Sequence, residues 1–319
     1  MKREYKLDKK DLKILDVVSD NARLSYSQIG KITMISKDRV RERILNLQKN
    51  IFILSFFPLI GYEKLGYRKF HVLISFKSLE DANKTQANIK RLNNVMAFTW
   101  LAGNYDYEIQ LLSKNEKEIR IQLNKAGLTK DKIKKIVILP ANIVYYTMLV
   151  NKDNNKELWS YKENRLESNK IDNIDKNILY CLSQEGRTKL IDMAGKLKVS
   201  PDVVRYRIKL LISKGIICGF YSRVNKHRFG LNSYIYLIKL KNNDKEILHE
   251  ISKLHNVYYI SSSKGYWTAL LNLYAKDNKE LIETLNKIRG ISKSDILNSE
   301  LIILLDRYFF NTFPEILLE

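Results

Sequence analysis

The sequence predicts an α+β protein made by tandem duplication, in which each copy carries a winged helix-turn-helix followed by a ferredoxin-like βαββαβ domain. The first observation behind this prediction is an alignment without gaps between residues 7–66 and 171–230, at a constant offset of 164 positions. The second is that the hydrophobic period changes within each copy from helical spacing to alternation. The third is length, because 319 residues suit two to four compact modules and a duplication favours an even number.

The duplicated positions include charged residues as well as apolar ones. The recurring residues are Asp8, Asp11, Ile14, Leu15, Arg23, Ser36, Val40, Arg41, Arg43, Ile44, Leu47 and Gly66, which return as Asp172, Asp175, Ile178, Leu179, Arg187, Ser200, Val204, Arg205, Arg207, Ile208, Leu211 and Gly230. Proteins that recognise symmetric DNA usually need two copies of a recognition module, so the duplication is a first indication of function.

Three helices are expected at the start of each copy. Apolar residues recur at intervals of three and four from Leu12 to Val18, and the stripe continues to Ile35. Ser36 is a suitable N-cap for the third helix, and in the second copy Ser200 is followed by Pro201, which is favoured at the first helical position. Three short helices followed by strands indicate a winged helix.

A strand, helix, strand, strand, helix, strand pattern follows from about residue 69. Residues alternate over 70–76 and 105–111, where Asp106, Glu108 and Gln110 face away from the apolar side chains, so these strands are expected to be half-buried. Helices are expected near 80–92 and 116–126, and a closing strand over 136–150. The second copy repeats the pattern over 234–240, 245–254, 257–262, 267–274, 279–287 and 296–310.

These patterns divide the chain into five segments. The predicted segments are a first winged helix-turn-helix at 1–60, a first ferredoxin-like domain at 61–150, a polar linker at 151–170, a second winged helix-turn-helix at 171–224 and a second ferredoxin-like domain at 225–319. The linker has nearly balanced charge, and Leu158, Trp159 and Tyr161 are its candidates for docking on a neighbouring surface. Twenty extended residues reach roughly 60 to 70 Å, so linker length leaves the pairing of the copies open.

The basic charge is the strongest compositional signal. The formal net charge is +21, of which +13 lies in residues 1–150, and such a surface attracts polyanions, nucleic acid above all. A genome biased towards Lys, Asn and Ile is the alternative explanation. No apolar run approaches the roughly 18 residues of a membrane span, and no apolar segment follows the basic start, which predicts a cytoplasmic protein. Cys181 and Cys218 lack metal or disulfide spacing, and the sequence predicts no metal and no cofactor.

The third helix of each copy is the candidate DNA-recognition helix, because it combines an apolar inner stripe with donors for phosphates and base edges. The candidate DNA-binding residues are Ser36, Lys37, Arg39, Arg41 and Arg43 in the first copy, and Ser200, Asp202, Arg205, Tyr206 and Arg207 in the second. The second copy has Val203 where the first has Arg39, so the first is expected to contribute more affinity. The alternative for any single helix of this kind is a solvated charged face.

The chain resembles two tandem members of the Lrp/AsnC family, the feast/famine transcription regulators of bacteria and archaea. The residues that carry the resemblance are the runs 7–15 with 21–25, 171–179 with 185–188, 199–208, 214–220 and 229–231. The resemblance implies a winged helix that binds double-stranded DNA and a ferredoxin-like domain of the RAM type that dimerises. It also implies that the two αβ domains of this chain pack as a pseudo-dimer, with further self-association left open.

Many members of that family bind an amino acid effector, and the family's loop resembles Gly103, Asn104, Tyr105 and Asp106 here. Asp106 is suited to an ammonium group, and backbone N–H groups beside Gly103 are suited to a carboxylate. The second copy has Trp267 and Thr268 at the positions of Tyr105 and Asp106, which argues against the same mechanism there. A plain β-turn between strands is the alternative for this loop.

The competing hypothesis is a tetrapyrrole enzyme, because siroheme decarboxylases resemble the same family and share its architecture. Their His-Asn-Tyr run has no convincing counterpart: the matching strands read Met96 to Trp100 and Tyr258 to Ser262, and His255-Asn256 is followed by Val257. The four histidines, His71, His227, His249 and His255, share no metal spacing and no pattern for nucleophilic catalysis, so each is expected on the surface or in packing. The sequence therefore predicts no catalytic residues.

Overall fold

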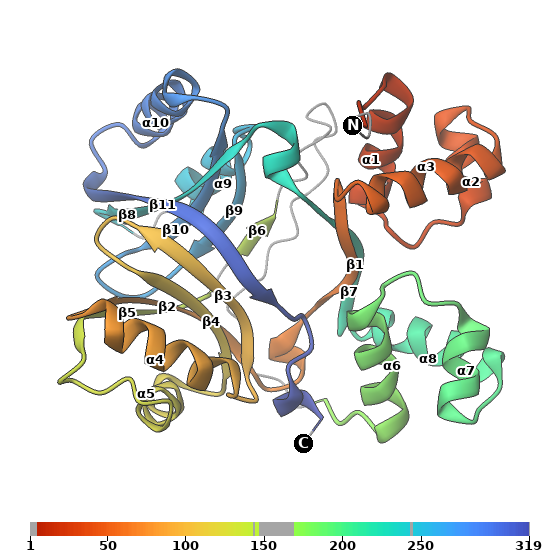
Figure 1. Cartoon of the computed structure of the whole chain (residues 1–319), viewed down its shortest axis with the longest axis horizontal. Helices are drawn as coiled ribbons and strands as arrows, with labels where there is room; N and C mark the ends of the chain where they lie inside the picture. The colour runs from red at the N-terminus through yellow and green to blue at the C-terminus, as the bar shows by residue number, and fades with distance from the viewer. Residues whose placement is uncertain (1–4, 143, 147–168, 243–244, 319) are drawn as a thin grey trace. The chain divides into compact units, whose positions relative to one another are not determined.

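The computed structural model describes residues 5–142, 144–146, 169–242 and 245–318, which fall into two compact units (Figure 1). Unit 1 contains the described residues of 1–61 and 171–230, and unit 2 contains those of 62–147, 156–170 and 231–319. The predicted domains therefore associate by type, with both helical modules in unit 1 and both αβ domains in unit 2. The expected linker at 151–170, with Leu158, Trp159 and Tyr161, lies almost wholly outside the described residues.

Unit 1 has three helices in each of its two modules. These are α1 (Lys9–Asp20), α2 (Tyr26–Thr33) and α3 (Lys37–Lys49), and then α6 (Asn173–Gln184), α7 (Leu190–Leu197) and α8 (Pro201–Ser213). The side chain of Asp8 accepts hydrogen bonds at the start of α1, as Asp172 does at α6 and Ser200 at α8. The predicted inner stripes are buried, including Ile14, Leu15, Val40, Ile44 and Leu47.

The strand that follows each module pairs with its counterpart in the other copy. Strands β1 (Ile53–Ile60) and β7 (Ile217–Val224) form a two-stranded antiparallel sheet, with Pro58 opposite Phe220. The sequence predicted a wing in each module. In the structure, each copy contributes one strand, β1 or β7, to the shared two-stranded sheet. A single strand leaves its backbone groups unpaired, so pairing across the copies satisfies them and joins the two modules.

Unit 2 contains a single nine-stranded sheet shared by both copies. Its strands are β2 (Arg68–Phe76), β3 (Val95–Ala102), β4 (Tyr107–Ser113), β5 (Ile133–Pro140), β6 (Val144–Tyr146), β8 (Asn232–Leu240), β9 (Val257–Ser262), β10 (Ala269–Ala275) and β11 (Ile296–Phe310), in the order β5-β2-β4-β3-β11-β8-β10-β9-β6. Helices α4 (Leu79–Lys90) and α5 (Glu116–Lys125) lie beside the first half-sheet, and α9 (Lys245–Ser252) and α10 (Asn278–Ser292) beside the second (Figure 1). Short 3-10 helices cover Tyr62–Lys64, Lys226–Phe229 and Glu315–Leu317.

The closing strands differ from the sequence prediction. The segment expected as one strand over 136–150 is divided into β5, which pairs with β2 of its own copy, and β6, which pairs with β9 of the other copy. Residues 143 and 147–150 lie outside the described part. Strand β11 pairs on one side with β8 and on the other with β3, so the final strand of the second copy joins the two half-sheets.

The inner faces of the two half-sheets enclose a shared core. Apolar residues of both copies pack together there, including Leu73, Tyr105, Leu237, Trp267 and Ile302. The sequence predicted half-buried strands with Glu108 and Gln110 on an open face, but Glu108 is 0% and Gln110 4% exposed. Alternation within one strand does not foresee this burial, but the pseudo-dimer implied by the resemblance does, because in it each sheet covers the open face of the other. In the structure, β4 is an interior strand whose polar face is covered by the other half of the sheet.

Candidate nucleic-acid interface

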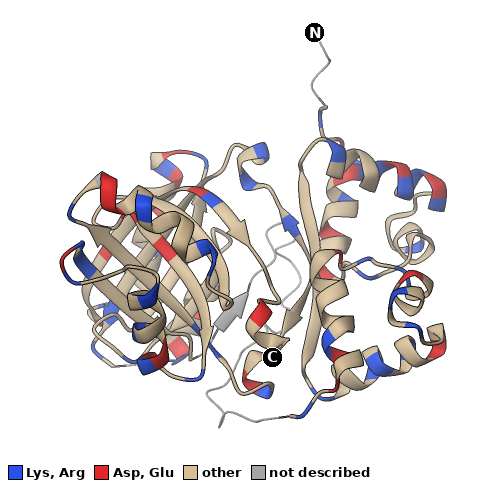
Figure 2. Cartoon of the chain, turned by 60° about the horizontal axis from the view of Figure 1, so that its bottom comes forward, with Lys and Arg blue, Asp and Glu red and all other residues tan. Residues whose placement is uncertain are grey.

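Helix α3 presents most of the predicted contact residues to solvent. Ser36, Lys37, Arg39 and Arg41 are all exposed, and the three cations have no ion pair among the described residues. Val40 and Ile44 on the opposite side are buried and fix the helix to its module. The turn before α3 places Met34 in the left-handed region with φ 59°, and its side chain is 90% exposed. Basic residues are spread over the helices of unit 1 (Figure 2).

Helix α8 presents a different surface at the equivalent positions. Ser200, Asp202, Arg205 and Tyr206 are exposed, and Tyr206 is 64% exposed. Arg205 forms an ion pair with Asp202, three positions earlier on the same helix. Since the position of Arg39 is occupied by an exposed Val203 in this copy, α8 carries fewer unpaired cations than α3.

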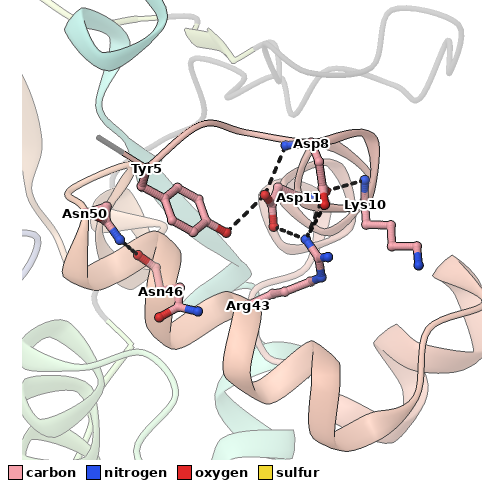
Figure 3. Close-up of polar contacts among 7 residues, drawn as sticks. All are labelled: Tyr5, Asp8, Lys10, Asp11, Arg43, Asn46 and Asn50. Atoms are coloured by element: carbon pink, nitrogen blue, oxygen red, sulfur yellow. Dashed lines mark hydrogen bonds and ion pairs between the residues drawn. The ribbon is translucent and has the colours of Figure 1, made fainter. Parts of the chain in front are cut away.

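Arg43 and Arg207 lie differently from the other predicted contact residues. Arg43 is half-buried, and its Nη1 lies 2.9 Å from a carboxylate oxygen of Asp8 and 2.7 Å from one of Asp11 (Figure 3). Tyr5 donates a hydrogen bond of 3.0 Å to the other oxygen of Asp11. Burial, together with that bond to Asp11, raises the pKa of Tyr5 to about 12. Arg43 therefore attaches α3 to the start of α1.

The second copy repeats this attachment with the equivalent residues. Arg207 Nη1 lies 2.7 Å from Asp172 Oδ2 and 3.3 Å from Asp175 Oδ2. Among the described residues, both arginines thus orient a recognition helix by contacting carboxylates. A sequence signal for this role was present, because the same two aspartates recur with the same arginine at the repeat offset.

A second reciprocal contact joins the two modules. Arg23 Nη1 donates to the carbonyl oxygens of Gly186, at 2.8 Å, and Thr188, at 3.1 Å. Arg187 donates in return to the carbonyl oxygens of Ala22 and, at 2.9 Å, Leu24. Because each arginine binds the backbone of the other copy, the contacts have pseudo-twofold symmetry.

Backbone bonds around these arginines follow the same symmetry. Ala22 donates its N–H to the carbonyl of Phe220, and the equivalent Gly186 donates to the carbonyl of Phe56, both at 2.8 Å. A Cβ atom at Gly186 would lie 2.8 Å from the backbone of Phe56, which explains glycine at this position. Together with the pairing of β1 and β7, these bonds join the two modules that carry α3 and α8 within unit 1. Sequence reasoning used Arg23 and Arg187 only as markers of the repeat.

The predicted effector residues do not converge on one space. Gly103 and Asn104 are exposed, whereas Tyr105 is 0% exposed and packs in the shared core. The Asp106 carboxylate accepts the N–H of Phe76 at 2.7 Å. In the second copy, Thr268 Oγ1 accepts the N–H of Leu240 at 2.7 Å, so the two residues perform the same task at the end of a strand.

The described part of the chain contains no group of three His, Cys, Asp or Glu side chains positioned to hold a metal ion. None of its helices is long and apolar enough to cross a membrane. Cys181 and Cys218 are free thiols of intermediate exposure.

Comparison with known proteins supports the assignment of both modules. Residues 7–48 match the family model of the AsnC-type helix-turn-helix domain, and residues 171–217 match a model of winged helix-turn-helix DNA-binding domains. Over its whole length the chain is similar in fold to the crystal structure of the siroheme decarboxylase NirDL, with a TM-score of 0.62, 12% identity and coverage of 93% of this chain and 91% of the other. At that identity the likeness shows the fold alone.

The curated relatives include regulators from Pyrococcus horikoshii. The HTH-type transcriptional regulator LrpA is 30% identical over 130 residues, which cover 39% of this chain and 92% of LrpA. An uncharacterised HTH-type transcriptional regulator of the same organism is 32% identical over 107 residues, which cover 34% of this chain and 72% of the relative. The coverage of about two fifths agrees with a tandem arrangement in which one copy equals one relative. With two helix-turn-helix modules and this similarity, the chain belongs to the Lrp/AsnC family of DNA-binding transcription regulators.

Proposed function

We propose that this protein binds DNA sequence-specifically as a covalent pseudo-dimer, in which one chain contacts two unequal half-sites. The observation that carries the proposal is the reciprocal joining of the two helix-turn-helix modules by Arg23 and Arg187 within unit 1. Dimeric helix-turn-helix proteins contact half-sites about one helical turn apart, which requires a fixed relation between the recognition helices.

The two helices differ in the residues available for contact. Lys37, Arg39 and Arg41 on α3 are exposed cations, while on α8 Arg205 is engaged by Asp202 and Tyr206 is an exposed aromatic. Within the proposal, α3 supplies most of the phosphate contacts. Arg43 and Arg207 act by orienting their helices.

The test uses equivalent single substitutions, Arg41→Ala and Arg205→Ala, on DNA selected from a random duplex library. We expect Arg41→Ala to weaken DNA binding more than Arg205→Ala does. The ion pair between Arg205 and Asp202 already reduces the attraction of Arg205 for phosphate. If Arg41 contacts a phosphate, its loss lowers the slope of log affinity against log salt by about 0.9. If it contacts a base, its loss costs about 1 to 3 kcal/mol and relaxes sequence preference.

Lys287→Ala on the exposed face of α10 is the charge-matched control and should leave DNA binding unchanged. Equal losses from Arg41→Ala and Arg205→Ala would contradict the asymmetry. If selection from the random library enriches no sequence, the proposal of sequence-specific binding is wrong.

The alternative function is that of a tetrapyrrole enzyme. Its support is the fold shared with NirDL, a protein that was also crystallised with an iron-uroporphyrin III analogue. Our proposal assigns no catalytic role to this chain, and an absorption spectrum of the purified protein distinguishes the two: a Soret band would favour the enzyme. An amino acid effector at Gly103 to Asp106 stays a prediction, and the bond from Phe76 to Asp106 favours the plain turn.

A further inference from the structure

The interior of unit 2 contains a polar cluster that the DNA-binding proposal does not use. His71, on β2, is fully buried; its Nδ1 lies 2.7 Å from Glu108 Oε1, and its Nε2 lies 2.7 Å from the hydroxyl of Tyr259 on β9. Burial lowers the pKa of His71, so the neutral ring donates to Glu108 and accepts from Tyr259. The bond joins the two half-sheets through their centre.

Two unpaired charged atoms lie on one wall of this cluster. Glu108 is 0% exposed, and its second carboxylate oxygen, Oε2, has no hydrogen-bond partner among the described residues. The same is true of the buried Nη2 of Arg307 on β11. Across the sheet Glu108 is opposite Thr99, and Thr99 is opposite Arg307. Two strand spacings place the backbones of the two charged residues roughly 10 Å apart.

The side chain of Arg307 points to the inner face, because its Nε donates to Thr99 Oγ1 at 3.2 Å. Glu108 and Arg307 influence each other electrostatically, yet no pair of their nitrogen and oxygen atoms approaches to within 4.0 Å. Burial raises the pKa of Glu108, but the hydrogen bonds from His71 and Gln110 and the charge of Arg307 lower it to about 2. Both residues are therefore charged at neutral pH, and a buried charged atom without a partner costs several kcal/mol.

The cluster contains two basic side chains and one carboxylate. Lys69 Nζ lies 4.8 Å from the ring centroid of Tyr259, and burial lowers the pKa of Lys69 to about 7. Below that pH, protonated Lys69 and Arg307 together face the single carboxylate of Glu108. Ser261 Oγ on β9 and Asn272 Oδ1 on β10 are also buried without partners among the described residues. A small monoanion would balance the excess charge, and a donor on it would satisfy Glu108.

We propose that this interior binds a small carboxylic acid with a hydrogen-bond donor on the adjacent carbon, of the 2-hydroxy acid class. Its carboxylate pairs with Arg307 Nη2, and its hydroxyl donates to Glu108 Oε2. A bound anion favours the protonated form of Lys69. This second cation favours a hydroxy acid over an amino acid, because a zwitterion would leave it unbalanced. The site is distinct from the loop at Gly103 to Asp106 and does not depend on DNA binding.

The test is calorimetric titration of the full chain with L-lactate, acetate, methyl lactate and L-alanine. Lactate should bind at least tenfold more tightly than acetate, which lacks the donor, and than methyl lactate, which lacks the charge. Glu108→Gln should reduce the preference for lactate over acetate towards one, because only lactate uses Oε2. Arg307→Lys should weaken both acids more than tenfold, since lysine loses the planar donor pair.

Glu283→Gln and Arg289→Lys on the exposed face of α10 make the same chemical changes outside the cluster and should alter nothing. Circular dichroism checks that each variant is folded; if Arg307→Lys is not, the four probes on the unsubstituted chain decide alone. Tighter binding of alanine than of lactate would overturn the charge argument. If none of the four compounds binds, the proposed site is wrong and solvent occupies this interior.

Discussion

At the scale of single residues, the two copies share the side chains that bind backbone carbonyls or orient helices. They differ in side chains that face solvent. Arg23 and Arg43 recur as Arg187 and Arg207 with the same partners, whereas Arg39 becomes Val203. A change of residue can also preserve a task, as when Asp106 and Thr268 each accept a backbone N–H. The divergence is therefore concentrated where a partner would be contacted.

Asp16 gives a prediction at this scale, because its Oδ1 is buried without a partner among the described residues. Burial raises the pKa of Asp16 from 3.8 to about 6. The folded chain then binds more protons than the unfolded chain between these two values, so stability falls as pH rises through this window and stays reduced above it. Asp16→Asn removes the cost, and we expect a gain of about 1 kcal/mol at pH 7.5 after allowance for solvent screening.

Urea unfolding at pH 7.5 and pH 4 measures the effect, which should be much smaller at pH 4. Glu42→Gln on exposed α3 is the control and should show no such dependence on pH. A gain of equal size at both pH values would show that the benefit does not come from the charge of Asp16.

At the scale of elements, the end of the recognition helix shows how one position differs between the copies. Gly215, after α8, has φ 67°, and the equivalent Ile51, after α3, has φ 55°. A β-branched residue in the left-handed region is strained by about 1 to 2 kcal/mol, whereas glycine is not. Asn50, one position earlier, has φ −94°, so the left-handed residue of the first copy is Ile51.

Ile51→Gly should therefore stabilise unit 1, even though glycine gains more freedom in the unfolded chain. The side chain of Ile51 is 53% exposed, so little burial is lost, and we expect a net gain of about 0.5 kcal/mol. Gly215→Ile is the reverse change and should destabilise by about 1 kcal/mol or more. Thermal unfolding of both variants measures the difference. A destabilised Ile51→Gly would mean that side-chain contacts outweigh the strain.

Elements with a strong local pattern were predictable from the sequence. The helices described in unit 1 and most strands of unit 2 follow from apolar spacing, because each has an apolar face that packs within its own copy. The division of 136–150 into β5 and β6 was not predictable in this way, since β6 pairs with a strand more than 100 residues away. Local alternation likewise placed Glu108 on an open face, because it contains no information about the sheet that covers it.

The candidate sites also differ in whether a local pattern in the sequence predicts them. The candidate recognition helices were predicted from cations beside an apolar stripe, and in the structure α3 exposes Lys37, Arg39 and Arg41. The attachments of Arg43 and Arg207 depend on aspartates 32 and 35 residues earlier, and the interior cluster requires residues of both copies, so neither follows from one helix or strand.

At the scale of the whole molecule, duplication turns contacts between subunits into contacts within one chain. Each unit contains one part from each copy, joined by strand pairing between β1 and β7 in unit 1 and between β3 and β11 in unit 2. Association within a chain does not depend on protein concentration, whereas a dimer of separate subunits dissociates on dilution.

We therefore expect a single chain to bind its DNA site with one-to-one stoichiometry at every concentration from nanomolar to micromolar. Light scattering should show a monomer at concentrations where gel shifts still show full binding, and the apparent affinity should not change when the protein stock is diluted and held before mixing. The same pairing of strands between two chains, with each chain contributing one copy to each unit, would instead give a dimer whose dissociation abolishes binding. Mixing the chain with a version of different mass separates the cases, because exchange between chains yields a mixed dimer and pairing within a chain yields none.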